Sequence, residues 1–342
     1  MPKVPFISVV MPVYNCEQYV REAIESILHQ TFQEFEFIII NDGSTDQTPE
    51  ILNEYAKKDI RIKVINQLNS GIVVALNRGL FESKSEWIFR MDGDDVALPH
   101  RFAVQIKAIE KNPSLILLGG WCQQINTEGV FLKVNKYPSH HNKLIHNLEA
   151  HNQFFPHPTA CFRRGVVMKL EGYRERFRHA EDIDLWFRMV GHGQFACCDD
   201  VILCLRKHEK NISNFDFGRI QQVKAVAAFV CNFQRKYRRF DPSQMNEKNW
   251  QEFLFWIENE MDSNGYFQKM QGIDALRKAW YSKPGTNMLK KGVSVGSEII
   301  CNSVARKIIW KQFGNSNFIL KLAKRSEEAL KYMGDLKITN FL

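Results

Sequence analysis

The sequence predicts an α/β protein with a mostly parallel β-sheet flanked by helices, followed by a mainly helical C-terminal region. Three observations predict this fold class. Short apolar runs alternate with helical patterns over the first 125 residues, polar clusters directly follow three of these runs, and the pattern from about residue 215 onward is helical and basic. Apolar strands that alternate with amphipathic helices are typical of a parallel sheet covered on both faces.

The first half of the chain contains five expected strands and four expected helices. The strands are short runs rich in β-branched residues, expected at Ile7–Tyr14, Phe35–Ile40, Lys63–Asn66, Glu86–Met91 and Leu115–Gly119. The helices are expected at Glu17–Gln30, after Asp46, at Ile72–Phe81 and at Arg101–Lys111, the last ending before Pro113. Asn15 with Gln18 resembles a capping box, and Asp46 is a plausible N-cap.

The pattern is looser beyond residue 126. Strands are expected at Phe154–Arg163 and Phe195–Arg206, with a helix at Asp182–Val190 between them. A boundary is expected near 210–215, which divides the chain into a domain at 1–212 and a helical region at 213–342.

The net charge of +8 is concentrated in the last third of the chain. Residues 211–342 hold 21 Lys and Arg against 12 Asp and Glu, an excess of nine positive charges. This excess fits peripheral association with an anionic membrane or a phosphate-bearing lipid, and equally a solubilising surface on a helical region. No nucleic-acid-binding motif accompanies it, so a nucleic-acid partner is not expected.

The cysteines and the hydropathy pattern indicate the cellular compartment of the protein. The eight cysteines include no C-x-x-C pair, and the chain shows neither a signal-peptide pattern nor an apolar run of transmembrane length. We therefore expect a cytoplasmic protein with reduced thiols, located in part at the inner face of the plasma membrane.

The sharpest local signal is Met91-Asp92-Gly93-Asp94-Asp95, at the end of an expected strand. Closely spaced carboxylates repel one another unless a cation or hydrogen-bond donors hold them. Hard oxygen ligands at this density suit Mn²⁺ or Mg²⁺ shared with phosphate oxygens. A solvated acidic turn is the alternative interpretation of this segment.

A second polar segment, Asn41–Asp46, follows the second expected strand. Asp42 would lie at the sheet edge, where it could accept a hydrogen bond from a base or a ribose. Ligands of such sheets bind beyond the carboxyl ends of the strands, so the loops after three strands should converge on one crevice. Neither a G-x-G-x-x-G fingerprint nor a G-x-x-x-x-G-K-[ST] phosphate loop is present, which argues against a dehydrogenase.

Five segments in this order, SVVMPVYN, IIINDGSTDQT, NSGIVVALNRG, MDGDD and HAEDIDLW, resemble the family 2 glycosyltransferases of GT-A fold. The resemblance covers roughly residues 6–208, and each segment is loose by itself but specific in combination. It implies a GT-A-like fold for 1–212 and an enzyme of the glycosyltransferase class that uses a nucleotide-sugar donor.

The resemblance also assigns candidate residues for the donor site. It implies that Pro12, Val13, Tyr14 and Asn15 line the nucleotide and that Asp42 binds the base. Asn69, Gly71 and Arg78 would approach the nucleotide-sugar, with a helix-surface ion pair as the alternative for Arg78. Asp92 and Asp94 match the D-x-D motif for metal and diphosphate, with Gly93 between them, and Asp95 could orient donor-sugar hydroxyls.

The resemblance makes Asp182 the general base, while a simple helix cap is the alternative. Asp184 is expected to be structural, and Glu181 to assist or to face the acceptor. His208 would complete the metal site together with Asp92 and Asp94. His157 resembles a segment near the acceptor, although packing between prolines explains it equally well.

The function implied is inverting transfer of a sugar from a nucleoside-diphosphate-sugar, with UDP the commonest nucleotide in the family, to a hydroxyl of a saccharide or lipid-linked acceptor. Such a reaction belongs to cell-surface polysaccharide or glycolipid synthesis. The Q-x-x-R-W segment of the family's processive synthases is absent, so addition of one or a few sugars is expected. A non-catalytic nucleotide-sugar-binding protein and a nucleotidyltransferase of similar fold are the alternatives.

Overall fold

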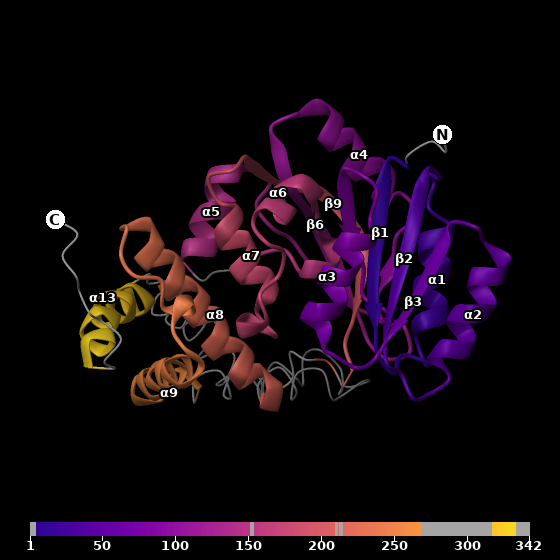
Figure 1. Cartoon of the computed structure of the whole chain (residues 1–342). Helices are drawn as coiled ribbons and strands as arrows, with labels where there is room; N and C mark the ends of the chain where they lie inside the picture. Colours follow the sequence, from indigo (N-terminus) through magenta and orange to yellow (C-terminus); the bar gives the residue numbers. More distant parts are fainter. Residues whose placement is uncertain (1–4, 151–153, 209–210, 212–214, 268–316, 333–342) are drawn as a thin grey trace, which may run out of the picture. The chain divides into compact units, whose positions relative to one another are not determined.

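The computed structural model describes residues 5–150, 154–208, 211, 215–267 and 317–332. These residues form two compact units, the first from residues up to 148 and 153–211, the second from 149–152 and 212 onward. Figure 1 shows the elements of both. The division lies next to the expected boundary after residue 212.

The first unit is built on one mixed sheet. The sheet order is β3-β2-β1-β4-β8-β6-β9-β5, with β7 paired to β6. The strands are β1 (Ile7–Val13), β2 (Phe35–Asp42), β3 (Ile62–Gln67), β4 (Trp87–Arg90), β5 (Val96–Ala97), β6 (Leu115–Ile125), β7 (Phe131–Asn135), β8 (Cys161–Arg163) and β9 (Gln194–Arg206).

The first four strands are parallel, as the alternation of strands and helices predicts, and the sheet then becomes mixed. β4 and β6 both pair antiparallel with the short β8, whereas β6 and β9 run parallel. The fold class expected from the sequence is confirmed, and the antiparallel strands are an addition that the apolar runs did not indicate.

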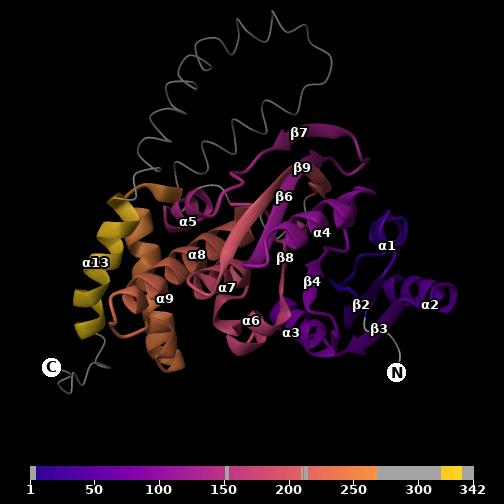
Figure 2. The same cartoon turned by 90° about the horizontal axis from the view of Figure 1, so that it is seen from above.

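Helices cover both faces of the sheet (Figure 2). They are α1 (Val20–Leu28), α2 (Thr48–Lys58), α3 (Ile72–Glu82), α4 (Arg101–Lys111), α5 (His141–Glu149), α6 (Arg164–Lys169) and α7 (Glu181–Met189), with short 3₁₀ turns η1 (His157–Thr159) and η2 (Glu175–Phe177). The apolar sides of α1, α2 and α4 share one large core with alternate residues of β1, β2 and β4. The opposite face of β2 packs against Ala75 of α3.

Three expected elements have clearly different bounds. The strand expected to end at Gly119 continues to Ile125 as β6. The first helix begins at Val20 rather than Glu17, and it has no side-chain cap. Asn15 does not form the expected capping box because it adopts a positive φ of 49° and accepts a hydrogen bond from the Thr45 amide at 2.8 Å instead. The expected strand at 154–163 is a strand only at Cys161–Arg163, because the two prolines flanking His157 favour the 3₁₀ turn η1.

The second unit is helical, as expected. Its described residues form α8 (Phe215–Lys236), η3 (Pro242–Gln244), α9 (Glu247–Ser263) and α13 (Asn317–Tyr332). α8 packs against both α9 and α13 through buried side chains such as Val226, Phe253 and Leu322. Within the described part of the chain, no helix is both long enough and apolar enough to span a membrane.

Candidate functional site

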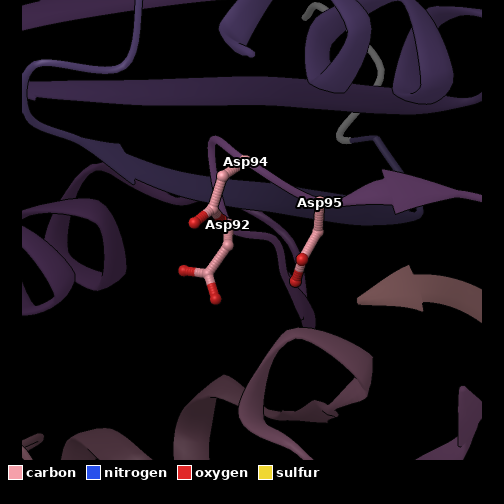
Figure 3. Close-up of side chains that lie close together, drawn as sticks. All are labelled: Asp92, Asp94 and Asp95. Atoms are coloured by element: carbon pink, nitrogen blue, oxygen red, sulfur yellow. The ribbon is translucent and has the colours of Figure 1, made fainter. Parts of the chain in front are cut away.

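The acidic turn Asp92–Asp95 lies directly beyond the carboxyl end of β4. Carboxylate oxygens of Asp92, Asp94 and Asp95 all lie within 4.8 Å of one another. Figure 3 shows Asp92 and Asp94 side by side, with Asp95 next to them. Gly93 fits between them because any Cβ would lie 2.8 Å from Cγ1 of Val13, so the turn packs closely against the end of β1.

The end of β9 brings His208 to this turn. Nε2 of His208 lies 2.8 Å from Oδ2 of Asp94, and Nδ2 of Asn211 lies 3.2 Å from the same ring nitrogen. The imidazole stacks on the Tyr19 ring, with centroids 5.2 Å apart. The family resemblance implied that His208 lies near Asp94. The contacts of Asn211 and Tyr19 with His208 were not expected from the sequence.

Asp95 is held by Arg206, the last residue of β9. Its Oδ1 accepts a hydrogen bond from the Arg206 amide at 2.8 Å, while Oδ2 has no hydrogen-bond partner within the described chain. The Arg206 guanidinium donates to the Asp94 carbonyl at 2.9 Å and lies over the Tyr19 ring. Burial, then the charges of Asp94 and Asp92, raise the pKa of Asp95 well above its usual value.

Asp92 pairs with a buried arginine that the sequence analysis did not single out. The Arg90 guanidinium forms an ion pair with Oδ2 of Asp92. Burial and the neighbouring Asp94 raise the pKa of Asp92, while Arg90 opposes that rise. The position of an arginine directly before an acidic turn was the available signal.

The donor set at this turn fits a hard divalent cation. It offers carboxylate oxygens at short mutual distances, one unpartnered buried oxygen on Asp95 and an imidazole beside Asp94. Oxygen-rich sets of this kind suit Mg²⁺ or Mn²⁺.

Helix α7 begins with Glu181 and Asp182. The Asp182 carboxylate accepts from the Ile183 amide at 2.8 Å. Its pKa is raised, chiefly by burial and in part by the charge of Asp92. Burial and the charge of Asp182 raise the pKa of Glu181 to about 7. Asp184 is fully buried and pairs with Arg174 and Arg188, as expected of a structural residue.

The loops after β1 and β2 meet at the same edge of the sheet. Pro12 and Val13 are buried in β1, and Tyr14 is 48% exposed. Asp42 ends β2 and is buried, where it accepts hydrogen bonds from Ser70 N at 2.9 Å and Gly71 N at 2.8 Å. The structure therefore gives Asp42 a role in shaping the β3–α3 loop, and its contact with a base stays a prediction.

The β3–α3 loop contains Asn69 and Gly71. Asn69 is exposed, and Gly71 has a φ of 89° at the start of α3. Arg178 donates to the Ser70 carbonyl at 2.8 Å, linking this loop to the segment before α7. Arg78 forms an ion pair with Glu82 at 2.8 Å along α3, which is the alternative arrangement that the sequence left open.

His157 lies in η1, close to the start of α7. It is buried, its Nε2 lies 2.8 Å from the Tyr173 hydroxyl, and its ring meets Trp186 edge to face. Burial, together with the Arg90 charge, lowers its pKa well below the usual value, so the imidazole is neutral at physiological pH.

Comparisons with known proteins identify the family of this chain. The model of glycosyl transferase family 2 matches residues 8–171. The O-antigen biosynthesis glycosyltransferase WbnJ of Escherichia coli is 36% identical over 66% of this chain and 85% of its own length. An uncharacterized glycosyltransferase of Methanocaldococcus jannaschii is 35% identical over 69% of this chain and 81% of its own.

Solved structures share the fold. The crystal structure of S. aureus TarS 1–349 in complex with UDP-GlcNAc has a TM-score of 0.55 and 21% identity over 76% of this chain and 74% of that one. The mannosyltransferase PcManGT from Pyrobaculum calidifontis, in complex with GDP-Man and Mn²⁺, has a TM-score of 0.55 and 14% identity over 95% of this chain and 87% of that one. With its GT-A-like sheet and these relatives, this chain belongs to glycosyltransferase family 2 and is a glycosyltransferase.

Proposed function

We propose that this glycosyltransferase moves a sugar from a UDP-sugar to a hydroxyl acceptor with inversion at the anomeric carbon. The observation that supports this most is the cluster that the Asp92–Asp95 carboxylates and His208 form beyond the carboxyl end of β4. The acceptor would belong to a cell-surface polysaccharide or glycolipid, as the relation to an O-antigen glycosyltransferase suggests.

Asp92, Asp94 and His208 would hold Mn²⁺ or Mg²⁺ together with the donor diphosphate. A divalent cation bound there supplies positive charge against the charge that develops on the leaving diphosphate. A Mn²⁺-bound structural neighbour and the oxygen-rich donor set support this assignment. Asp95 would orient donor-sugar hydroxyls.

Residues of the loops beyond β1, β2 and β3 would bind the rest of the donor. Pro12, Val13, Tyr14 and Asn15 would line the nucleotide, and Asp42 would lie against the base. Asn69, Gly71 and Gly93 would lie close to the nucleotide-sugar through their backbones. UDP and UDP-GlcNAc in the TarS structures favour a uridine nucleotide.

Asp182 would act as the general base. As the acceptor oxygen forms its bond to the anomeric carbon, the bond from that carbon to the diphosphate breaks, and the hydroxyl proton passes to the Asp182 carboxylate. One displacement without a protein nucleophile inverts the configuration, as in inverting hydrolases. General-base assistance of this type contributes about 10²–10⁴-fold in rate.

The proposal is tested by separating donor binding from donor cleavage. UDP-sugars should raise the Tm of the wild-type protein in the presence of Mn²⁺. At a hundredfold excess over Kd, the free energy of unfolding should increase by about 2.7 kcal/mol. Asp182→Asn should keep this stabilisation but lose at least about 100-fold of the slow hydrolysis of the donor. Asp94→Asn should lose the Mn²⁺-dependent stabilisation itself.

Asp199→Asn is the matched control, because Asp199 is an exposed aspartate of β9 outside the acidic turn. It should behave as the wild type in both measurements. Full hydrolysis by Asp182→Asn would assign the base to another residue, and donor binding that does not depend on metal would remove the metal site.

A further inference from the structure

Arg90 is a buried arginine whose backbone is held in place on both sides. It ends β4 and is 5% exposed. Its amide donates to the Ala160 carbonyl at 3.0 Å, and its own carbonyl accepts from Nη2 of Arg101 at 2.7 Å. Because side chains alternate along a strand, Arg90 faces away from the large core that contains Trp87 and Phe89. The sheet therefore sets the face on which the Arg90 side chain lies.

The guanidinium of Arg90 has few hydrogen-bond partners for so buried a cation. It forms an ion pair with Asp92, while its Nε has no hydrogen-bond partner within the described chain. A guanidinium has five N–H donors, and burial of a charge is costly unless it is paired. Its compensation must therefore come from nearby carboxylate charge.

The carboxyl groups of the acidic turn lie close to this charge. Arg90 forms an ion pair with Asp92, and carboxylate oxygens of Asp92, Asp94 and Asp95 all lie within 4.8 Å of one another. These three groups are the anionic residues on which the proposed metal site depends.

Two other arginines of this unit donate to backbone carbonyls as well as to side chains. Arg101 is fully buried and donates to Gln105 and to the Arg90 carbonyl. Arg188 pairs with Asp184 and also donates to the carbonyls of Leu170 at 2.6 Å and Gly172 at 2.7 Å. These contacts are typical of arginines that join chain segments. Arg90 has a different set of contacts, because its ion pair is with the acidic turn.

We propose that Arg90 is a built-in countercation, a positioning residue that balances the carboxylates of the Asp92–Asp95 turn before metal and donor bind. The inference rests on the proposed function of these carboxylates. With Arg90 in place, the anionic groups can remain together in the metal-free protein. A divalent cation then adds to a site whose negative charge is already partly balanced.

This role has a consequence that simple packing would not have. If Arg90 is replaced by an uncharged residue, the carboxylates of the metal-free protein repel one another more strongly. A divalent cation then relieves a larger repulsion than it does in the wild type. The variant should therefore be less stable without metal, and metal should stabilise it by more.

The experiment measures Tm with and without MnCl₂, in the absence of donor, for the wild type and three variants. Arg90→Met removes the charge and keeps an apolar stem, and Arg90→Lys keeps the charge. Arg188→Met is the matched control, since it breaks the Arg188–Asp184 ion pair, which lies on α7 and outside the acidic turn. We expect Mn²⁺ to raise the Tm of Arg90→Met by at least about 3 °C more than that of the wild type.

Arg90→Lys and Arg188→Met should show the wild-type response to Mn²⁺, although Arg188→Met lowers the Tm in both conditions. If Arg90→Met does not fold, Arg90→Gln, which retains amide donors without charge, is judged by the same criterion. A Mn²⁺ response of the uncharged variants equal to or smaller than that of the wild type would overturn the inference and leave the metal site intact. A wild type that does not respond to Mn²⁺ would overturn both proposals.

Discussion

Glu181 and Asp182 are neighbours at the start of one helix, but their carboxylate oxygens differ in their hydrogen bonds. Asp182 accepts a hydrogen bond from the Ile183 amide, whereas Oε2 of Glu181 is buried without a hydrogen-bond partner within the described chain. Hydrogen bonds to the charged form favour ionisation, and burial opposes it. Burial raises the pKa of both carboxyl groups, and it raises that of Glu181 to about 7 together with the charge of Asp182, while the Ile183 amide opposes the rise at Asp182.

The raised pKa of Glu181 predicts a pH dependence of stability. The pKa rises from 4.5 to about 7 on folding, because of burial and the charge of Asp182. Between these values the folded chain binds the proton more strongly than the unfolded chain, so stability falls as pH rises through this range. Glu181→Gln removes the titrating group, and should be more stable than the wild type at pH 8, by up to about 3 kcal/mol.

The measurement is urea unfolding of both proteins at pH 5 and pH 8. The difference between variant and wild type should be small at pH 5 and larger at pH 8. The same difference at both pH values would mean that the Glu181 proton is not linked to folding.

At the scale of elements, the loop between β3 and α3 is shaped from two directions. Asp42 holds the amides of Ser70 and Gly71 from β2, and Arg178 holds the Ser70 carbonyl from the segment before α7. A Cβ at Gly71 would lie 1.9 Å from Nη2 of Arg178, so glycine is required both by its φ of 89° and by this contact. The loop that would approach the nucleotide-sugar thus depends on a residue far along the chain.

Gly71→Ala should therefore strain the backbone and displace Arg178 from the loop. We expect a loss of about 1–3 kcal/mol in stability, typical of a strained left-handed residue, and weaker donor binding. Urea unfolding and titration with a UDP-sugar in Mn²⁺ measure the two effects.

Gly129→Ala provides the control, because Gly129 has a similar φ of 81° but no atom within 4 Å of its Cβ position. It should lower stability without changing donor affinity, whereas Arg178→Ala should weaken donor binding without the backbone strain. Equal donor affinity in Gly71→Ala and the wild type would show that this loop is not part of the donor site.

At the scale of the molecule, the positive charge lies in the helical unit. At the end of α8, the run Lys236–Arg239 is exposed, with Tyr237 56% and Phe240 37% exposed. Basic side chains beside exposed aromatic rings suit the surface of an anionic bilayer. The compact α/β unit, by contrast, has nearly balanced charge over residues 1–210.

We predict that the full chain binds vesicles that contain phosphatidylglycerol, and not vesicles of phosphatidylcholine alone. Each basic residue near such a surface contributes about 1 kcal/mol, so Arg238→Gln/Arg239→Gln should weaken binding by about tenfold or more. Sedimentation with vesicles measures this, and added salt should reduce binding of the wild type.

The control variant Lys248→Gln/Lys321→Gln removes the same number of charges from exposed positions on α9 and α13. This control variant should bind the phosphatidylglycerol vesicles more tightly than Arg238→Gln/Arg239→Gln does. Equal weakening by both pairs would indicate a diffuse charge effect, and absence of binding at low salt would reject the membrane association.

Local pattern was enough for most of the fold and for the acidic turn. The apolar runs identified β1, β2 and β3, and Arg101–Lys111 was expected with the bounds that the structure has. These elements are encoded by neighbours in sequence, because periodic burial of one face is a local property. The short β8 and the true start of α1 were missed, since a strand of three residues and an uncapped helix have little local signal.

By itself, the sequence determined the α/β class and the acidic turn at Asp92–Asp95, because both depend on residue type and spacing along the chain, and it offered His208 as a metal ligand only through the family resemblance. Only the tertiary structure decided that Arg90 pairs with Asp92, that Arg206 holds Asp95, and that Asp42 and Arg178 shape the same loop. The physical reason is that burial and electrostatic pairing depend on which segments the sheet order brings together. Distance along the chain does not reveal that order.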